Sequence, residues 1–360
     1  PNWNGKITQG PLDIGFTEAF ILPATGDRVP CVYVENDHVL GLQANDPIQV
    51  SYTTKIGNMP TGKENPELLR MKHSHGHDQS IVNGVGRIGV MQGGTSALWN
   101  DEDIAQRLTD RAKAFMGRNQ RNPFFLYFAT HDIHVPRLPH AKFLGKSGYG
   151  NRGDALLQLD DSVGQLMKTL DSLHLTQNTL VILTSDNGPV VDDGYIDQSK
   201  ELLGNHQPAS YLKGGKYSSF EAGTRVPFIV SWPAKIKKGT SNALLSQIDF
   251  VSTMATLLGQ SVDVTQAKDS DNQLAAWTGE SVQGRTHVIE QAGSLAIRQG
   301  DWKYISPSKG AAFNAFVGIA LGNNPSDQLY HLSNDPSEKV NLANENPDKV
   351  QELKTLLRTL

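Results

Sequence analysis

The sequence has only one cysteine, Cys31, among its 360 residues. No disulfide can therefore form within the chain, and a zinc site built from several cysteine ligands is excluded. Cys31 lies in the apolar segment 29–34, which has the composition of a strand. We expect a small buried side chain rather than a reactive thiol, since reactive thiols lie in polar, electropositive surroundings.

A large excess of charge of either sign is also lacking. The chain has 33 lysines and arginines against 37 aspartates and glutamates, a formal net charge of -4. This balance gives no support for a nucleic-acid partner or for membrane binding through a basic patch. No apolar run is long enough to span a bilayer, and we detect no internal repeat or low-complexity tract.

The alternation of strand and helix patterns predicts an α/β fold. The length exceeds what one compact core usually holds, so one large and one smaller domain are expected. Apolar, β-branched runs alternate with amphipathic segments in which apolar residues recur at three-four spacing. The strand candidates are 20–22, 32–35, 123–130, 180–184 and 226–231, and the helix candidates are 101–116, 154–173 and 249–258. Such alternation is typical of layered α/β cores.

The pattern changes near residue 280. Short strand candidates separated by tight turns predict a small antiparallel sheet, followed by an amphipathic helix over 347–360 that Pro347 opens. The four strand candidates are 286–290, 295–298, 302–305 and 328–332. We therefore expect a large α/β domain, 1–279, and a C-terminal subdomain, 280–360.

The strand candidate 180–184 ends abruptly at Ser185, Asp186, Asn187 and Gly188. A run this apolar predicts a strand buried on both faces, as in a parallel sheet covered by helices. In such sheets ligands bind beyond the carboxyl ends of the strands, where Asp186 and Asn187 would offer hard oxygen ligands suited to calcium. The alternative is a simple Asn-Gly turn. The residues that follow do not resemble a returning strand, which favours the metal site.

The strand candidate 123–130 likewise ends at polar groups, His131 to His134. His134 precedes Pro136, which stiffens the loop, and we expect it to donate a proton or hydrogen bond to an anionic substrate or departing oxygen. His131 is a weaker candidate that could equally orient the loop. The alternative for both is a structural histidine.

A third candidate, Lys216, follows the glycine pair Gly214-Gly215. Two glycines allow the backbone and the ammonium group to come close to a ligand, and a lysine there would act as a point charge for an oxyanion. The alternative is a solvated loop lysine, which we expect Lys213 to be.

Two further groups are candidates for a substrate pocket. His75 and His77 belong to the histidine-rich stretch 72–78, which follows no strand end that would fix it as a metal site. Asn205 and His206 come shortly before the Gly-Gly-Lys turn.

Taken in order, these segments resemble the type I sulfatases of the alkaline phosphatase superfamily. Phe-Ala-Thr-His-Asp-Ile-His-Val-Pro at 128–136, Thr-Ser-Asp-Asn-Gly at 184–188 and Lys-Gly-Gly-Lys with Phe-Glu-Ala-Gly-Thr-Arg-Val-Pro at 213–227 carry the likeness. The phrases at 298–304 and 329–338 look like that family's C-terminal subdomain. The likeness implies a mixed, mostly parallel sheet sandwiched by helices, with a small C-terminal antiparallel sheet and helix.

The resemblance also implies a function, the calcium-dependent hydrolysis of a sulfate monoester, expected on a carbohydrate. Asp186 and Asn187 match the family's second pair of metal ligands. His134 matches the histidine that contacts the sulfate or its leaving oxygen, and Lys216 the lysine that bridges the same group. A periplasmic or extracellular location suits such an enzyme.

Three parts of the family pattern do not occur in these residues. The nucleophile is a formylglycine made from Cys or Ser in a C-x-P-x-R type motif, whereas Cys31 is followed by Val-Tyr-Val-Glu. The family's first pair of calcium aspartates and its Lys-x-His segment are missing too. Because calcium takes about six to eight oxygens, we expect the chain to be the C-terminal part of a longer sulfatase and to be inactive alone.

Three alternative functions remain at this stage. Phosphonate monoester hydrolases and phosphodiesterases share the scaffold and its oxyanion-binding metal. A catalytically inactive sulfatase-like binding module would carry the same motifs without hydrolysis. A plain structural α/β domain with an accidental Asp-Asn-Gly turn is the third.

Overall fold

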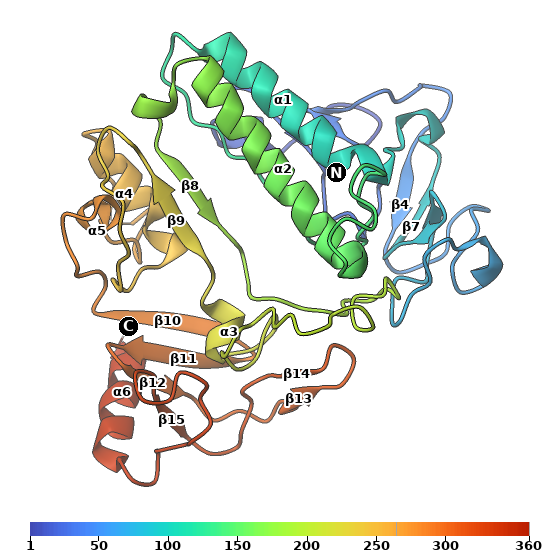
Figure 1. The fold of residues 1–360 in the computed structure, drawn as a ribbon. Helices are drawn as coiled ribbons and strands as arrows, with labels where there is room; N and C mark the ends of the chain where they lie inside the picture. The colour runs from blue at the N-terminus through green and yellow to red at the C-terminus, as the bar shows by residue number, and fades with distance from the viewer. Residues whose placement is uncertain (264, 360) are drawn as a thin grey trace. The chain divides into compact units, whose positions relative to one another are not determined.

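The computed structural model describes residues 1–263 and 265–359 (Figure 1). They form two compact units, the first made of 1–175 with 191–206 and the second of 176–190 with 207–360. The expected domain boundary between residues 279 and 280 falls inside the second unit, and that division stays a prediction.

The N-terminal part of the first unit is built from short strands and turns. Its largest sheet has three antiparallel strands in the order β1-β2-β3, and two further strand pairs are β4-β7 and β5-β6. The strands are β1 (Phe20–Ile21), β2 (Val34–Glu35), β3 (His38–Val39), β4 (Gln49–Ser51), β5 (Ile81–Val82), β6 (Val85–Gly86) and β7 (Val90–Gln92). Single 3-10 turns are η1 (Pro11–Ile14), η2 (Pro66–Leu68), η3 (Thr95–Ala97) and η4 (Asp101–Asp103).

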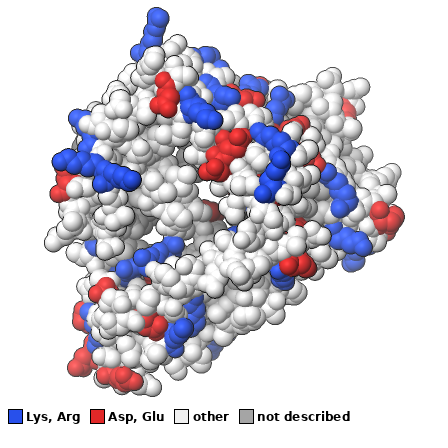
Figure 2. Space-filling model, in the orientation of Figure 1, with Lys and Arg blue, Asp and Glu red and all other residues white. Residues whose placement is uncertain are grey.

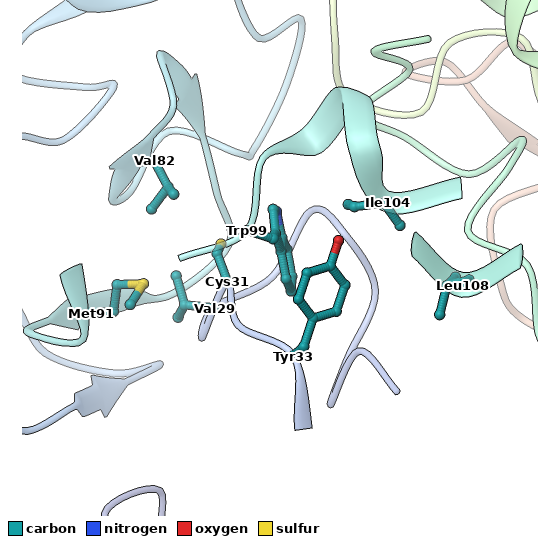
Figure 3. Close-up of a cluster of buried hydrophobic side chains, with 8 residues drawn as sticks. All are labelled: Val29, Cys31, Tyr33, Val82, Met91, Trp99, Ile104 and Leu108. Carbon is teal, nitrogen blue, oxygen red and sulfur yellow. The ribbon is translucent and has the colours of Figure 1, made fainter. Parts of the chain in front are cut away.

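A buried apolar cluster holds this part together (Figure 3). Cys31 lies inside it, fully buried beside Tyr33, Met91 and Trp99. Burial raises the pKa of the Cys31 thiol to about 12, so the group stays protonated and unreactive. The prediction of a buried, structural cysteine is confirmed.

Two amphipathic helices complete the first unit, α1 (Ile104–Asn119) and α2 (Gly150–Ser172). They lie side by side, and the amide groups of Gln106 and Gln165 exchange hydrogen bonds of 3.2 and 3.1 Å. The helix predicted from residue 101 begins at Ile104, because Asp101–Asp103 forms a 3-10 turn instead.

In the second unit the strand before Asp186 differs from its prediction. β8 (Val181–Thr184) pairs antiparallel with β9 (Phe228–Ser231), and it is not buried on both faces, since Leu183 is 37% and Ile229 59% exposed. The short helices of this unit are η5 (Thr176–Asn178), α3 (Glu221–Thr224), η6 (Gln247–Asp249), α4 (Phe250–Leu257) and α5 (Leu274–Thr278).

The C-terminal sheet has four antiparallel strands in the order β10-β11-β12-β15. They are β10 (His287–Ala292), β11 (Ser294–Gln299), β12 (Trp302–Ile305) and β15 (Gln328–His331), and a small hairpin adds β13 (Phe313–Asn314) and β14 (Ile319–Ala320). Helix α6 (Pro347–Thr359) packs Val350 and Leu353 against Ile297, Tyr304 and Leu329. The predicted sheet and helix are confirmed; Leu360, the last residue of the predicted helix, lies outside the described residues.

The strand predicted over 123–130 is wrong. This segment pairs with no strand among the described residues, and Phe125 and Tyr127 are 51% and 72% exposed. Its apolar composition alone does not make a strand, because a strand needs a partner for its backbone N–H and C=O groups.

The surface carries interspersed charges. On the face shown in Figure 2, basic and acidic side chains alternate, and neither sign gathers into an extended patch. Of the helices in the described part, none is long and apolar enough to cross a membrane.

Candidate functional site

Asp186 and Asn187 follow β8, where the strand gives way to a turn. Asp186 is exposed, and a carboxylate oxygen accepts a hydrogen bond from the Ser185 hydroxyl at 3.4 Å. The Asn187 amide nitrogen donates to the carbonyl oxygen of Gly188 at 2.9 Å. Within the described residues no donor contacts the Asn187 amide oxygen. Each residue thus presents side-chain oxygen for a ligand.

The backbone after Asn187 is tied to the loop that carries Lys216. Gly188 N donates to Gly223 O, and Lys216 N donates to Pro189 O, both at 2.9 Å. A Cβ at Gly188 would lie 1.6 Å from the carbonyl oxygen of Ala222. Only glycine permits so close an approach. The structure therefore brings the acid-amide pair and the lysine loop together, as two sequence-distant segments of one unit.

Lys216 and Lys213 have different surroundings in this loop. Lys216 is half-buried, and its ammonium lies 5.2 Å from the ring centre of Tyr217. Lys213, which we expected to be solvated, is half-buried instead. Its ammonium donates to Glu338 O at 2.9 Å and lies 3.9 Å from the centre of the Phe220 ring. These contacts make Lys213 a structural anchor, and burial lowers its pKa.

Next to this loop lies a buried charge cluster that sequence reasoning missed. Lys303 is fully buried, with its ammonium 2.9 Å from Glu221 Oε1, 3.0 Å from Glu290 Oε2 and 3.8 Å from Glu338 Oε1. A carboxylate oxygen of Glu338 also accepts from Glu221 N at 2.6 Å. The cluster joins α3 to β10, β12 and the segment after β15, so the C-terminal sheet holds the end of the Lys216 loop.

The pKa values of the cluster follow from burial and pairing. Although burial opposes it, Lys303 and Arg298 hold the pKa of Glu221 below its usual range. Burial raises the pKa of Glu338 to about 7, and Lys303 only partly offsets it. No local sequence motif predicts this cluster, because its members come from four distant segments.

In the first unit, His134 is fixed by its own loop. Its Nδ1 lies 2.8 Å from Val135 O and must donate to it, and its backbone N–H donates to His131 O at 3.0 Å. The neutral ring is therefore the Nδ1-protonated tautomer, and only the imidazolium can donate from Nε2. The neighbouring Asp132 accepts from the Gln158 amide at 3.0 Å. Burial raises the Asp132 pKa against the effect of His131.

His77 pairs with a carboxylate that the sequence did not single out, Asp27. The ring Nε2 lies 3.0 Å from Asp27 Oδ2. Burial by itself would raise the Asp27 pKa, but hydrogen bonds from His77 and Thr25 and the charge of His134 hold it well below its usual range. Asp27 therefore stays ionised, paired with His77 and stabilised further by the charge of His134. It occurs in a loop without a distinctive spacing, which explains why sequence reasoning missed it.

His75 lies against the segment 192–200. Ser74 donates its hydroxyl to Asp192 at 2.7 Å and lies 3.0 Å from His75 Nδ1, while the Lys200 ammonium is 2.7 Å from the other Asp192 oxygen. Backbone pairing joins the two stretches, since Ser74 N donates to Gly194 O at 3.0 Å.

Asn205 and His206 end the last segment of the first unit. Both are exposed, and the His206 ring lies 5.9 Å from that of Tyr149. His206 lines a cavity of about 370 Å³ beside the first turns of α2.

The metal expectation rests on few ligands. Among the described residues no group of three or more His, Cys, Asp or Glu side chains is arranged to hold a metal ion. The oxygens of Asp186 and Asn187 are of the kind calcium prefers, but they would fill only two of about six to eight positions.

The candidate residues thus form two sets, each held by its own unit. The second unit fixes Asp186, Asn187 and Lys216 around one backbone junction. In the first unit His77 pairs with Asp27, and the charge of His134 acts on the same carboxylate. His131 and His75 lie in the same loops as these two histidines, and Asn205 and His206 end another segment. The role of each residue stays a prediction.

Comparison with known proteins identifies the family to which the chain belongs. The family model described as Sulfatase matches residues 44–260. An N-acetylgalactosamine-6-O-sulfatase of Bacteroides thetaiotaomicron is 52% identical over 361 residues, covering 100% of this chain and 71% of that protein. Human arylsulfatase A is 32% identical over 256 residues, 66% of this chain and 49% of that protein.

A solved structure gives the same result. A 6S-sulfatase from Bacteroides thetaiotaomicron, described in connection with the metabolism of multiple glycosaminoglycans, superposes with a TM-score of 0.98 at 52% identity. The match covers 99% of this chain and 75% of that one. The predicted alkaline phosphatase-like α/β fold with a C-terminal antiparallel sheet is confirmed. The chain belongs to the sulfatase family.

Proposed function

We propose that this chain, acting with a segment that supplies a formylglycine nucleophile, hydrolyses the 6-O-sulfate ester of an N-acetylgalactosamine unit in a sulfated carbohydrate. The observation that carries the proposal is the 52% identity, across the whole chain, to a protein named for that reaction. The junction between the Asp186 turn and the Lys216 loop supports it, because the chemistry needs oxygen ligands and a cation close together.

Asp186 and Asn187 are the residues that would hold calcium. Hydrogen bonds from the described residues leave oxygen lone pairs on both side chains unoccupied. Carboxylate and amide oxygens are hard ligands of the kind calcium prefers. A bound calcium ion would supply charge stabilisation for the sulfuryl oxygens. The remaining ligands would come from the same segment as the nucleophile.

Lys216 and His134 would act on the two ends of the ester. Lys216 brings a fixed positive charge to the sulfuryl oxygens, in a loop whose backbone is clamped to the Asp186 turn. A sugar alkoxide is a poor leaving group at neutral pH, so its oxygen needs a proton. His134, with Nδ1 committed to Val135 O, would deliver that proton from Nε2 as imidazolium.

The test is hydrolysis by the complete protein. We expect sulfate release from N-acetylgalactosamine 6-sulfate, much slower release from the 4-sulfate, and no turnover of a phosphonate monoester. Replacing Lys216 by Ala should lower kcat by roughly 10²–10³, and His134→Gln by roughly 10²–10⁴. Lys235→Ala, an exposed lysine of the same unit, serves as the control.

Two results would contradict the proposal. Turnover of the phosphonate without sulfate release would assign the protein to the phosphonate hydrolases. A protein that contains the nucleophile motif but hydrolyses none of the three esters would be a binding module.

A further inference from the structure

The first unit contains a cavity that the proposed hydrolysis does not use. It has a volume of about 370 Å³, within the range of small-ligand pockets. Its walls come from the start of α2 and from residues 199–206. The side chains that matter are Arg152, Leu156, Leu203, Tyr149, His206 and Ser199.

Arg152 is the notable wall residue, since it is only 5% exposed. Its Nε is buried without a hydrogen-bond partner, and its guanidinium makes no ion pair with any described residue. Burial, together with the charge of Arg137, lowers its pKa to about 10. A buried cation without a counter-charge is unfavourable, and such groups in folded proteins are normally paired.

The other buried arginines of this unit are paired. Arg137 Nη1 lies 2.8 Å from Asp197 Oδ2 and 2.8 Å from the Ser199 hydroxyl. Arg87 holds both Asp101 carboxylate oxygens, at 2.9 and 2.8 Å. Arg152 therefore differs from its neighbours in lacking an acid of its own.

The nearby carboxylates are already engaged. The second Asp197 oxygen accepts from Ser199 N at 3.1 Å. Asp154, two residues from Arg152, accepts from Gly145 N, Ser147 N and the Ser147 hydroxyl at 2.7 to 2.9 Å. Neither makes a direct ion pair with Arg152, and the charge of Asp197 only partly offsets the effect of burial on its pKa. The cavity therefore keeps a positive charge that has no contacting acid.

The rest of the wall suits a sugar ring. Tyr149 and His206 place their rings 5.9 Å apart at 54°, and both side chains are exposed. Leu156 and Leu203 add apolar surface. A pyranose has an apolar C–H face and polar edges, so flat aromatic and aliphatic walls with one buried cation match a sugar that carries an oxyanion.

We infer that this cavity binds an acidic saccharide unit, with its carboxylate or sulfate oxygens on Arg152 and its ring against Tyr149 and His206. The oxyanion would pair with Arg152, which alone among the buried arginines in the described part of the first unit contacts no carboxylate. The site does not depend on which ester the protein cleaves. His206 is its only wall residue that was a substrate-pocket candidate, and the proposed hydrolysis gives His206 no role.

The test is calorimetric titration of the complete protein. Sodium glucuronate and glucose 3-sulfate are the two acidic probes; glucose and inorganic sulfate control for the sugar and the anion alone. Arg152→Met should weaken binding of the preferred acidic sugar about tenfold or more, and Arg152→Lys by less. Arg121→Met, at an exposed arginine beyond α1, should change nothing. The probe that loses affinity identifies the oxyanion as carboxylate or sulfate.

Stability provides a second readout. Because Arg152 has no counter-charge, Arg152→Met should leave the unfolding midpoint unchanged or raise it. If that variant does not fold, Tyr149→Ala at an exposed ring must weaken acidic-sugar binding instead. Equal binding of glucose or free sulfate, no binding of either acidic sugar, or affinity unchanged in the Arg152 and Tyr149 variants would overturn the inference. Sulfate release measured on the same samples separates this result from the proposed function.

Discussion

Two antiparallel sheets of the second unit differ in how they are covered. In the C-terminal sheet Ile297, Tyr304 and Leu329 are fully buried, and α6 packs on them. The β8-β9 pair has a more apolar sequence, yet Leu183 and Ile229 remain exposed. An apolar sequence therefore does not decide whether a strand is buried, because burial depends on whether another element covers it.

The candidate site lies at the end of the less covered pair. Its backbone is held by contacts between loops, Gly188 to Gly223 and Lys216 to Pro189, rather than by a packed core. The other end of the Lys216 loop is attached through Glu221 to Lys303 of the well-packed sheet. The C-terminal sheet thus stabilises the Lys216 loop, which has no packed core beneath it where it meets the end of the β8-β9 pair.

The largest expected effect on stability comes from removing Lys303, which attaches the Lys216 loop to the C-terminal sheet through Glu221. Lys303→Met removes the fully buried cation that Glu221, Glu290 and Glu338 share, so the free energy of unfolding should fall by about 3–5 kcal/mol. Urea unfolding of the complete protein measures it, with Lys309→Met at an exposed lysine as the control. A loss below about 1 kcal/mol would mean that the cluster does not connect the sheet to the loop.

The two sheets can be compared directly by truncating one side chain in each. Leu353→Ala opens a cavity under the C-terminal sheet and should cost about 2–5 kcal/mol. Ile229→Ala removes atoms that are largely in water and should stay within about 0.5 kcal/mol. Equal losses in urea unfolding would show that the β8-β9 pair is covered in the complete protein.

The sequence predicted the strands of both sheets to within two residues, but it wrongly predicted burial on both faces for β8 and a strand over 123–130. Strand 302–305 was predicted at the observed residues, because its apolar pattern, turns and partners all lie within one short stretch. Strand 123–130 was wrong, since pairing depends on a distant segment. Lys303, Asp27 and Arg152 were missed for the same reason: ion pairs between remote segments, and the absence of one, leave no local pattern.

Calcium binding by Asp186, at the end of the β8-β9 pair, can be tested through stability. If Asp186 holds calcium in the complete protein, calcium at about one hundred times its Kd should raise the free energy of unfolding by about 2.7 kcal/mol. Asp186→Ala should remove that gain, whereas Asp160→Ala, at an exposed helical aspartate, should keep it. Stabilisation that persists in Asp186→Ala would place calcium elsewhere.

The smallest expected effect is the change with pH in the free energy of unfolding that Glu338 of the Lys303 cluster causes. Burial raises the pKa of Glu338 from its ordinary 4.5 to about 7. Between these values the unfolded chain has lost the proton that the folded protein still binds, so stability should fall as pH rises from about 4.5 to about 7. We expect Glu338→Gln, which keeps an acceptor for Glu221 N, to remove about 1–3 kcal/mol of that fall. Urea unfolding at pH 4.5, 6 and 7.5 measures the difference, and parallel pH profiles for the two proteins would show that Glu338 is ionised throughout and that Lys303 neutralises it.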